Sequence, residues 1–413
     1  MNKKLFTQIM NEWRSNLWVV TELLVVSVVM WYVVDYIYVQ VSIYKEPKGF
    51  DVSNCYLLSM GQLTDKSPDF IANDTLISEE ISEIIDRLSH RPEIEAVSLS
   101  QNSFPYNGSN SSTEVAYDTL RSTGFVVRRY ITPDFLRVFR YQGTRGETPE
   151  QLVAMMTKEN FLASDNLFER KYGVRLTPLV GKGFHLFGDT TQTYQLAASL
   201  KPVRYMDYQQ ARTSYSMVYW LSPKDFDTSL ELCVRVKEGQ DVDFISRLKA
   251  DSEKQLRVGN VFIADVRSFV DIRRNFQQLW NNELRNYLFG MGFLLLNIFL
   301  GLLGIFWFRT QQRRSEIALR KALGGTGRTI FGRLLMEGIL LLIVATVPAI
   351  IVDWNLAYVE MNSWMNGTTL ETGRFLITVA ITFVLILLMI IIGIGIPAYK
   401  AMKIQPADAL HEE

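Results

Sequence analysis

The 413-residue sequence is poor in the side chains that most catalytic and metal sites use. It has three histidines and two cysteines, and His90, His185 and His411 are not spaced as metal ligands are. The motifs H-E-x-x-H, C-x-x-C and G-x-S-x-G do not occur. We therefore expect neither a catalytic site nor a metal site in this chain.

A nucleotide-binding loop is also missing. Such a loop needs G-x-x-x-x-G-K-[ST] after a strand. Residues 324–329 read GGTGRT, with the wrong spacing, Arg in place of Lys and no preceding strand. We interpret this segment as a turn between helices. The chain is therefore predicted not to hydrolyse ATP by itself and to hold no cofactor.

Charged residues are nearly absent from four long windows. Residues 287–308 and 375–398 contain none, and residues 17–34 and 334–352 contain one acid each. About 20 apolar helical residues cross a hydrocarbon core of about 30 Å. The first window is too long for a cleaved signal peptide and lacks a small-residue cleavage site, so we interpret it as a retained anchor. We predict transmembrane helices at 17–38, 287–308, 334–352 and 375–398.

Lysine and arginine predict how these helices are oriented. Segment 309–333 carries seven basic residues and one acid, and the chain ends carry basic residues beside the first and last spans. Basic loops stay in the cytoplasm. We therefore place the amphipathic segment 1–16, segment 309–333 and the tail 399–413 on the cytoplasmic side of an inner (plasma) membrane. Residues 45–280 and the loop 353–374 then lie outside the cytoplasm.

Aromatic residues near the ends of the predicted spans agree with this orientation, because tryptophan and tyrosine favour membrane interfaces. The outer belt is expected to contain Trp31, Tyr32, Tyr36, Trp280, Tyr287 and Trp354, and the inner belt Trp18 and Trp307.

The region outside the membrane has two strand–helix–strand patterns separated by a long insertion. The first has its elements near 55–60, 78–92 and 95–100, and the second near 230–236, 241–256 and 260–266. The predicted fold class is an α-helical membrane protein with four transmembrane helices and a large α+β exoplasmic domain between helices 1 and 2. That domain is a split β-α-β part with an inserted subdomain at about 130–225.

Both cysteines, Cys55 and Cys233, fall in predicted strands outside the membrane. An oxidising compartment would permit a disulfide between them. Buried free thiols in strands are the interpretation that we favour.

One acid interrupts each of the two apolar windows 17–34 and 334–352. Glu22 and Glu337 both lie toward the cytoplasmic ends of their helices. Intramembrane acids often serve transport or proton transfer. Snorkelling to the interface, or pairing with Arg328 or Arg333, explains them without such a role, and we favour that interpretation.

Small residues and one amide form a stripe on the second span: Gly290, Asn297, Gly301 and Gly304. Such stripes let helices approach closely. The sequence leaves open whether this one is a dimer seam or part of the packing within the bundle.

Residues 313–325, RRSEIALRKALGG, form the most basic short segment of the chain. On a helical wheel one arc collects the cations and one apolar residue, namely Arg313, Arg314, Ile317, Arg320 and Lys321. The opposite arc collects Ala318, Leu319, Ala322 and Leu323. Glu316 and Arg320 have the favourable i,i+4 order, and Gly324 with Gly325 can end the helix in a left-handed cap.

This pattern predicts an amphipathic helix at the cytoplasmic surface. One face would lie on lipid or on the neighbouring spans, and the other would meet an acidic partner or anionic headgroups. A loop that is basic only because of its position beside the membrane remains the alternative.

The segment 313–338, RRSEIALRKALGGTGRTIFGRLLMEG, resembles the signature of the MacB/FtsX-like ABC transporter permeases, R-x-x-E-I-x-x-R-K-A-L-G-A followed by a Glu in the next span. Gly325 departs from the usual Ala. The phrase ITPDFLRVF at 131–139 resembles the family's extracytoplasmic domain. The end of the chain resembles the family's tail pattern at Pro397, Ala398, Ala401, Pro406, Ala409 and Leu410.

The resemblance implies a permease of the mechanotransmission type that works with a separately encoded ATPase, since the fused ATPase domain of MacB is absent from this sequence. Permeases of this family dimerise and bind two cytoplasmic ATPase subunits, which hold ATP and Mg²⁺. The segment after span two is their coupling helix, and the exoplasmic domain corresponds to their porter part. The implied work is efflux or envelope transport, with a periplasmic adaptor as a further expected partner.

The cargo, and whether the second permease is an identical copy or a paralogue, stay open. The alternative function is an FtsX-like scaffold that activates a periplasmic cell-wall hydrolase. The residues that the resemblance assigns to ATPase coupling are Arg313, Arg314, Glu316, Ile317, Arg320, Lys321, Leu323 and Gly324.

Overall fold

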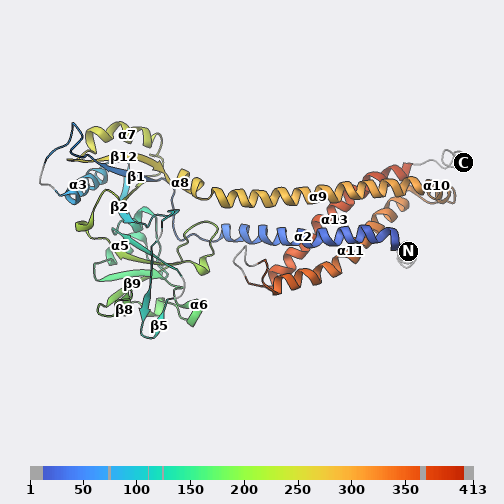
Figure 1. The fold of residues 1–413 in the computed structure, drawn as a ribbon, viewed down its shortest axis with the longest axis horizontal. Helices are drawn as coiled ribbons and strands as arrows, with labels where there is room; N and C mark the ends of the chain where they lie inside the picture. Colours follow the sequence, from blue (N-terminus) through green and yellow to red (C-terminus); the bar gives the residue numbers. More distant parts are fainter. Residues whose placement is uncertain (1–12, 73–75, 110, 123–124, 363–368, 404–413) are drawn as a thin grey trace. The chain divides into compact units, whose positions relative to one another are not determined.

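The computed structural model describes residues 13–72, 76–109, 111–122, 125–362 and 369–403 (Figure 1). His411, most of the predicted segment 1–16 and most of the tail 399–413 lie outside these residues. The chain forms two compact units. We call Ile43–Trp280 the sheet unit, and Met1–Ser42 together with Asn281–Glu413 the helical unit.

Four strands at one end of the main sheet interlock the two predicted β-α-β patterns. Their order is β12 (Val261–Ser268), β1 (Cys55–Gln62), β11 (Glu231–Val236) and β2 (Ile94–Gln101), with antiparallel neighbours. Helix α3 (Ile77–Ser89) connects β1 to β2, and α7 (Phe244–Gln255) connects β11 to β12. Each pattern thus has one strand between the two strands of the other, which confirms the predicted split α+β layer.

Helices α3 and α7 form because their apolar residues recur with helical spacing and have a core to enter. Ile81, Ile84 and Leu88 of α3 are buried together with Phe244 and Leu248 of α7. Burying one such side chain contributes about 1.5–3 kcal/mol. Figure 1 shows α7 beside β12 and α3 beside β2.

The insertion continues the same sheet. Strand β6 (Val126–Ile131) pairs with β2 through Ser100↔Ile131 and Gln101↔Tyr130. The remaining strands are β3 (Ser112–Thr113), β4 (Val115–Tyr117), β5 (Leu120–Arg121), β7 (Asn160–Ser164), β8 (Gly183–Leu186), β9 (Tyr194–Leu200) and β10 (Tyr215–Trp220). Short α-helices in and after the insertion are α4 (Phe135–Val138), α5 (Pro149–Met155), α6 (Glu169–Tyr172) and α8 (Phe269–Phe276). Three single 3₁₀ turns, η1 (Thr177–Leu179), η2 (Ala211–Thr213) and η3 (Pro223–Asp225), complete the sheet unit.

Cys55 and Cys233 are buried free thiols, so the favoured interpretation of the cysteines is confirmed. They lie on adjacent strands, but Cys233 is opposite Leu57 rather than Cys55. The Cys55 thiol contacts the carbonyl of Val138 at 3.2 Å. Burial raises the pKa of Cys55 to about 12.

We expect both thiols to resist alkylation in the folded protein. With a pKa of about 12, Cys55 holds roughly one part in ten thousand of the reactive thiolate at pH 8. Maleimide labelling followed by mass measurement should show neither residue modified in mild detergent and both modified after denaturation in SDS. Rapid labelling of the native chain would contradict this expectation.

Four helices of the described residues are long and apolar enough to cross a membrane. They are α2 (Trp13–Lys45), α9 (Gln278–Gln312), α11 (Gly327–Tyr358) and α13 (Thr372–Lys403). Each is longer than the span predicted for it. The 35 residues of α9 extend for about 52 Å at about 1.5 Å per residue, well beyond a hydrocarbon core of about 30 Å.

The helical unit packs around its own apolar core. Helices α11 and α13 approach closely at Gly338, where a Cβ would overlap the side chain of Ile394. Trp31 and Tyr36, which were predicted to lie near the outer membrane interface, are buried within the chain. Trp31 Nε1 donates to Thr378 Oγ1 at 3.0 Å, so this residue joins α2 to α13.

Candidate functional site

The basic segment forms the short helix α10 (Arg314–Ala322) between α9 and α11. It ends as predicted, because Gly324 adopts φ +95°. Gly324 N–H donates to Lys321 O at 3.0 Å and Gly325 N–H to Arg320 O at 2.9 Å, which is the Schellman pattern. Thr326 then caps α11 by accepting from the N–H of Thr329. The predicted turn between helices is confirmed.

The faces of α10 differ from the helical-wheel prediction. Ile317 and Ala318 are buried, whereas Leu319 and Leu323 are 53% and 80% exposed. Glu316 and Arg320 pair with each other at 2.5 Å, and both are largely exposed. Leu319 and Leu323 therefore do not pack on the neighbouring spans of this chain, and their contact with lipid, the other place predicted for this face, stays a prediction.

Anchors at both ends of α10 explain its orientation. Arg313, at the N-cap, lies 3.5 Å from Glu337 of α11. Lys321 Nζ donates to Met402 O of α13 at 2.8 Å. Long aliphatic stems allow cations to sit on the packed side of a helix while their charged ends reach polar partners. Arg314, at the start of the helix, is half-buried.

A buried ion pair lies where α9 leads into α10. Arg309 of α9 donates to Glu337 at 2.7 Å and to Asn16 of α2 also at 2.7 Å. The Glu337 side chain is 4% exposed. Arg309 and Arg313 are therefore the cations that hold Glu337, whereas the sequence suggested Arg328 or Arg333. The cluster joins α2, α9 and α11 through one carboxylate.

Glu22 lies apart from this cluster. Its carboxylate is beside Gly301, where a Cβ would come within 2.8 Å of Oε1. Among the described residues no cation pairs with Glu22, so the suggested pairing with Arg328 or Arg333 does not occur there.

The small-residue stripe on α9 divides between two environments. Gly301 packs against α2 through Glu22. A Cβ at Gly290 or Gly304 would meet nothing within 4 Å. Asn297 is exposed, and its Nδ2 donates to Phe293 O at 2.9 Å within the helix. One member of the stripe thus belongs to packing within the bundle, and three face away from the chain.

A cavity of about 350 Å³ lies between α10 and the first turns of α11. Its apolar lining includes Ile317, Ile330 and Leu334, and its polar lining includes Arg320 and Arg333. The predicted coupling segment is therefore a short helix with contacts at both ends, a hollow on one side and two exposed leucines.

A second buried ion pair was missed by the sequence reasoning. Asp35 of α2 lies 3.0 Å from Arg374 of α13, and Asn362 donates to Asp35 at 2.9 Å. The signal was present, because Asp35 is an acid inside the predicted span 17–38. Together with the Glu337 cluster, this pair fixes α2 to the bundle at two separate levels.

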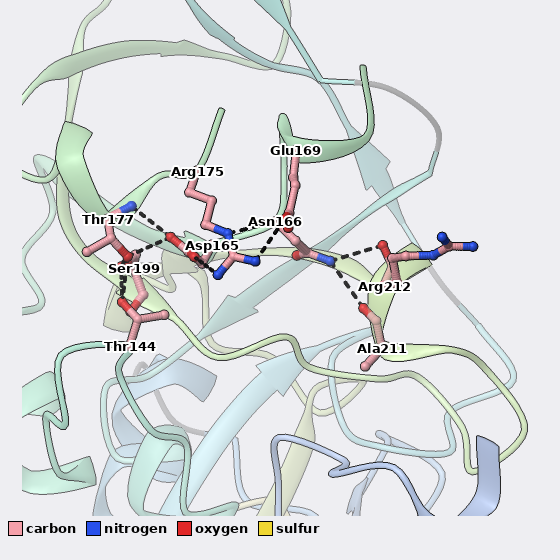
Figure 2. Close-up of polar contacts among 9 residues, drawn as sticks. All are labelled: Thr144, Asp165, Asn166, Glu169, Arg175, Thr177, Ser199, Ala211 and Arg212. Carbon is pink, nitrogen blue, oxygen red and sulfur yellow. Dashed lines mark hydrogen bonds and ion pairs between the residues drawn. The ribbon is translucent and has the colours of Figure 1, made fainter. Parts of the chain in front are cut away.

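A third polar group lies in the sheet unit (Figure 2). Asp165 accepts from the N–H and hydroxyl of Thr177 at 2.7 and 2.6 Å. The Thr177 hydroxyl also lies 2.9 Å from those of Thr144 and Ser199. Arg175 pairs with Glu169 at 2.8 Å at the edge of this group. A hollow of about 520 Å³ borders it, and no sequence motif marked these residues.

Comparison with known families gives one match. Residues 288–406 match the FtsX-like permease C-terminal family. No curated protein matches the sequence significantly. The family match covers the predicted coupling segment, most of α9, and all of α11 and α13. It confirms the resemblance to MacB/FtsX-like permeases that the signature indicated.

Two solved structures are similar to part of the chain. One is the periplasmic region of MacB from Actinobacillus actinomycetemcomitans, at 13% identity and a TM-score of 0.31, covering 57% of this chain and 98% of that one. The other is the extracellular domain of the noncanonic ABC-type transporter YknZ from Gram-positive bacteria, at 12% identity and a TM-score of 0.29, covering 51% of this chain and 100% of that one.

Proposed function

We propose that the chain is an ABC-transporter permease of the FtsX/MacB type. In this proposal it couples ATP hydrolysis by a separate cytoplasmic ATPase to a conformational change of its sheet unit outside the membrane. The chain itself is the non-catalytic membrane subunit. ATP and Mg²⁺ belong to the partner. Two permease chains, identical or related, act together and bind two ATPase subunits, and a periplasmic adaptor completes the assembly.

The observation that carries this proposal is the way α10 is presented. Anchors on both sides hold the helix, yet Leu319 and Leu323 remain exposed beside the Glu316–Arg320 pair. Exposed leucines next to a charged rim are typical of protein contact sites. Because Arg313 and Lys321 tie α10 to α11 and α13, a force on this surface would reach the bundle instead of bending a loose loop.

The proposal places the chain in the inner membrane with both termini and α10 in the cytoplasm. The sheet unit then lies on the opposite side, where it meets cargo or an envelope partner. Efflux or envelope transport by mechanotransmission is the function that we favour. An FtsX-like scaffold for a cell-wall hydrolase would use the same coupling.

Copurification from native membranes tests the proposal. We expect the tagged full-length chain, in mild detergent, to recover an ABC ATPase in near-equal amount. Arg320→Glu should reduce recovery of the ATPase several-fold, because it places a second carboxylate beside Glu316 and reverses the sign of the charge next to the exposed leucines. Lys249→Glu is the matched control, since Lys249 is an exposed cation of the sheet unit paired with Asp265.

The recovered proteins also separate the alternatives. Wild-type chain that recovers no ATPase would contradict the proposal. An envelope hydrolase bound to the sheet unit would favour the scaffold function, and a bound lipid, lipoprotein or peptide would favour transport.

A further inference from the structure

One loop of the sheet unit contacts both the segment by which the chain enters that unit and the segment by which it leaves. It comprises residues 201–213, between β9 and β10, and we call it the strap. Apart from the 3₁₀ turn η2 it has no regular structure. It contacts residues 43–50, which comprise the last residues of α2 and those after them and which we call the entry segment. It also contacts α8, which precedes α9.

The strap binds the entry segment through a buried guanidinium. Arg204 is fully buried, and it donates to Ile43 O and Glu46 O at 2.7 Å each. Its own N–H donates to Lys48 O at 2.9 Å. Ile43 lies in the last turn of α2, where helix carbonyls lack partners within the helix and favour a cation. Arg204 therefore caps the helix that leads into the sheet unit.

The strap binds α8 and the entry segment together through one carboxylate. Asp207 is fully buried, and it accepts from Arg273 Nε of α8 at 2.8 Å. Its other oxygen lies 3.4 Å from Lys48 Nζ and accepts from the Tyr106 hydroxyl at 2.7 Å. Burial alone favours the neutral acid, but the hydrogen bonds from Tyr106 and Arg273 help to outweigh it and lower the pKa of Asp207. The group is therefore an anion shared by both connections.

The strap is in turn fixed to the body of the sheet unit. Asn166 Nδ2 donates to Ala211 O and Arg212 O at 3.1 and 3.2 Å, as Figure 2 shows. At the other end, Gly49 adopts φ +79° and a Cβ there would overlap Pro202 O. A side chain at this glycine would push the entry segment off the strap.

Buried ion pairs are an expensive way to hold a fold, because apolar side chains of similar size often stabilise it as well or better. What the ionic arrangement supplies is directional contact, in addition to the apolar core that Phe50, Val203 and Phe269 of these segments share. Arg204 and Asp207 make such contacts with the two segments that lead to membrane helices.

We infer that Arg204 and Asp207 are positioning residues that lock the entry segment and α8 into one rigid junction, through which displacement of α2 and α9 reaches the sheet unit. The part of this inference that concerns transmission from α2 and α9 rests on the proposed function. The lock itself does not depend on any partner.

Hydrogen–deuterium exchange on the full-length chain in lipid nanodiscs, without nucleotide, tests the lock. In Asp207→Asn we expect residues 43–50 and 269–280 to exchange at least about tenfold faster, since each 1.4 kcal/mol of lost local stability is a factor of ten. Helix α3 and strands β1 and β2 should be unchanged. Asp265→Asn is the matched control, because Asp265 is an exposed acid that also faces two cations, Lys249 and Arg267.

Unchanged exchange of both connections in Asp207→Asn would overturn the inference. If that variant exchanges fast throughout and has not folded, Lys48→Met replaces it. This change removes one contact of Asp207 from a partly exposed position. Relative to the wild type, it should then accelerate hydrogen exchange of residues 43–50 more than that of residues 269–280. Equal acceleration of both segments would overturn the inference.

Transmission is tested on the complex with its copurified ATPase. In the wild type, addition of ATP with vanadate should change the hydrogen-exchange rates of α3 and α7. Asp207→Asn should keep ATP hydrolysis within about twofold but lose this nucleotide-dependent change, and Asp207→Glu should restore part of it. A variant that transmits like the wild type would overturn the inference. Failure to recover any ATPase would instead count against the proposed function, and the exchange test of the lock would still stand.

Discussion

Glu337→Ala is expected to destabilise the helical unit by about 3–5 kcal/mol, the cost typical of removing one partner of a buried ion pair. Glu337 is almost fully buried and lies within ion-pair distance of Arg309 and Arg313. Without it, two guanidinium groups would face each other in a largely apolar surrounding. We expect this to be the largest loss from removing any one charged side chain of the helical unit.

The loss should appear as an earlier thermal unfolding transition of the purified chain in detergent, followed by tryptophan fluorescence. Glu337→Gln should fall between the wild type and Glu337→Ala, because the amide oxygen still accepts a hydrogen bond. Glu316→Ala is the control. It removes an exposed i,i+4 pair of about 0.3–0.5 kcal/mol. Equal melting temperatures for Glu337→Ala and Glu316→Ala would show that the buried pair contributes little.

A structural consequence should accompany this loss. Arg313 is the N-cap residue of α10, and Glu337 orients it. Glu337→Ala should therefore loosen α10 even at temperatures where the bundle is folded. Faster hydrogen exchange of residues 314–322 at low temperature would reveal this. The carboxylate thus links the stability of the bundle to the position of the proposed contact helix.

The strand and helix pattern of the sheet unit was predictable because its signals are local. Apolar spacing within α3 marks which face is buried, and that face does contain Ile81, Ile84 and Leu88. The end of α10 was equally predictable, since a pair of glycines after a helix is a short-range signal. In such cases the residues that decide the structure lie within one turn of each other.

The orientation of α10 was not predictable by the same means. A helix of nine residues has a weak apolar face, so contacts made at its ends outweigh its own periodicity. Those contacts reach Glu337, 24 residues away, and Met402, 81 residues away. A helical wheel contains no information about either of them.

Buried pairs between distant segments were missed for the same reason. Asp35 meets Arg374 across 339 positions of the chain, and Asp207 meets Arg273 across 66. Asp35 could have been suspected as an acid within a span. Asp207 sits in a loop whose local sequence looks like an ordinary turn, so only the fold reveals that it is buried.

Leu323→Asp is expected to weaken binding of the copurified ATPase at least about tenfold while leaving the fold intact. Leu323 is 80% exposed in the chain alone and lies beside Leu319 and the Glu316–Arg320 pair. Burying a leucine contributes about 1.5–3 kcal/mol, and each 1.4 kcal/mol is a factor of ten in affinity. A carboxylate at this position would in addition have to lose its hydration in the contact.

Binding between the nanodisc-embedded chain and the purified ATPase, measured by titration, checks this expectation. Val242→Asp is the matched control, since Val242 is a similarly exposed apolar residue of the sheet unit. The free energy of unfolding of both variants should lie within about 0.5 kcal/mol of the wild-type value, as is usual for surface substitutions. Unaltered affinity in Leu323→Asp would exclude the exposed face of α10 as the contact. Glu337→Ala perturbs the same helix from its buried side. We therefore expect both variants to lose ATPase binding but only Glu337→Ala to lose stability. That result would distinguish the residues that contact the ATPase from those that hold α10 in place.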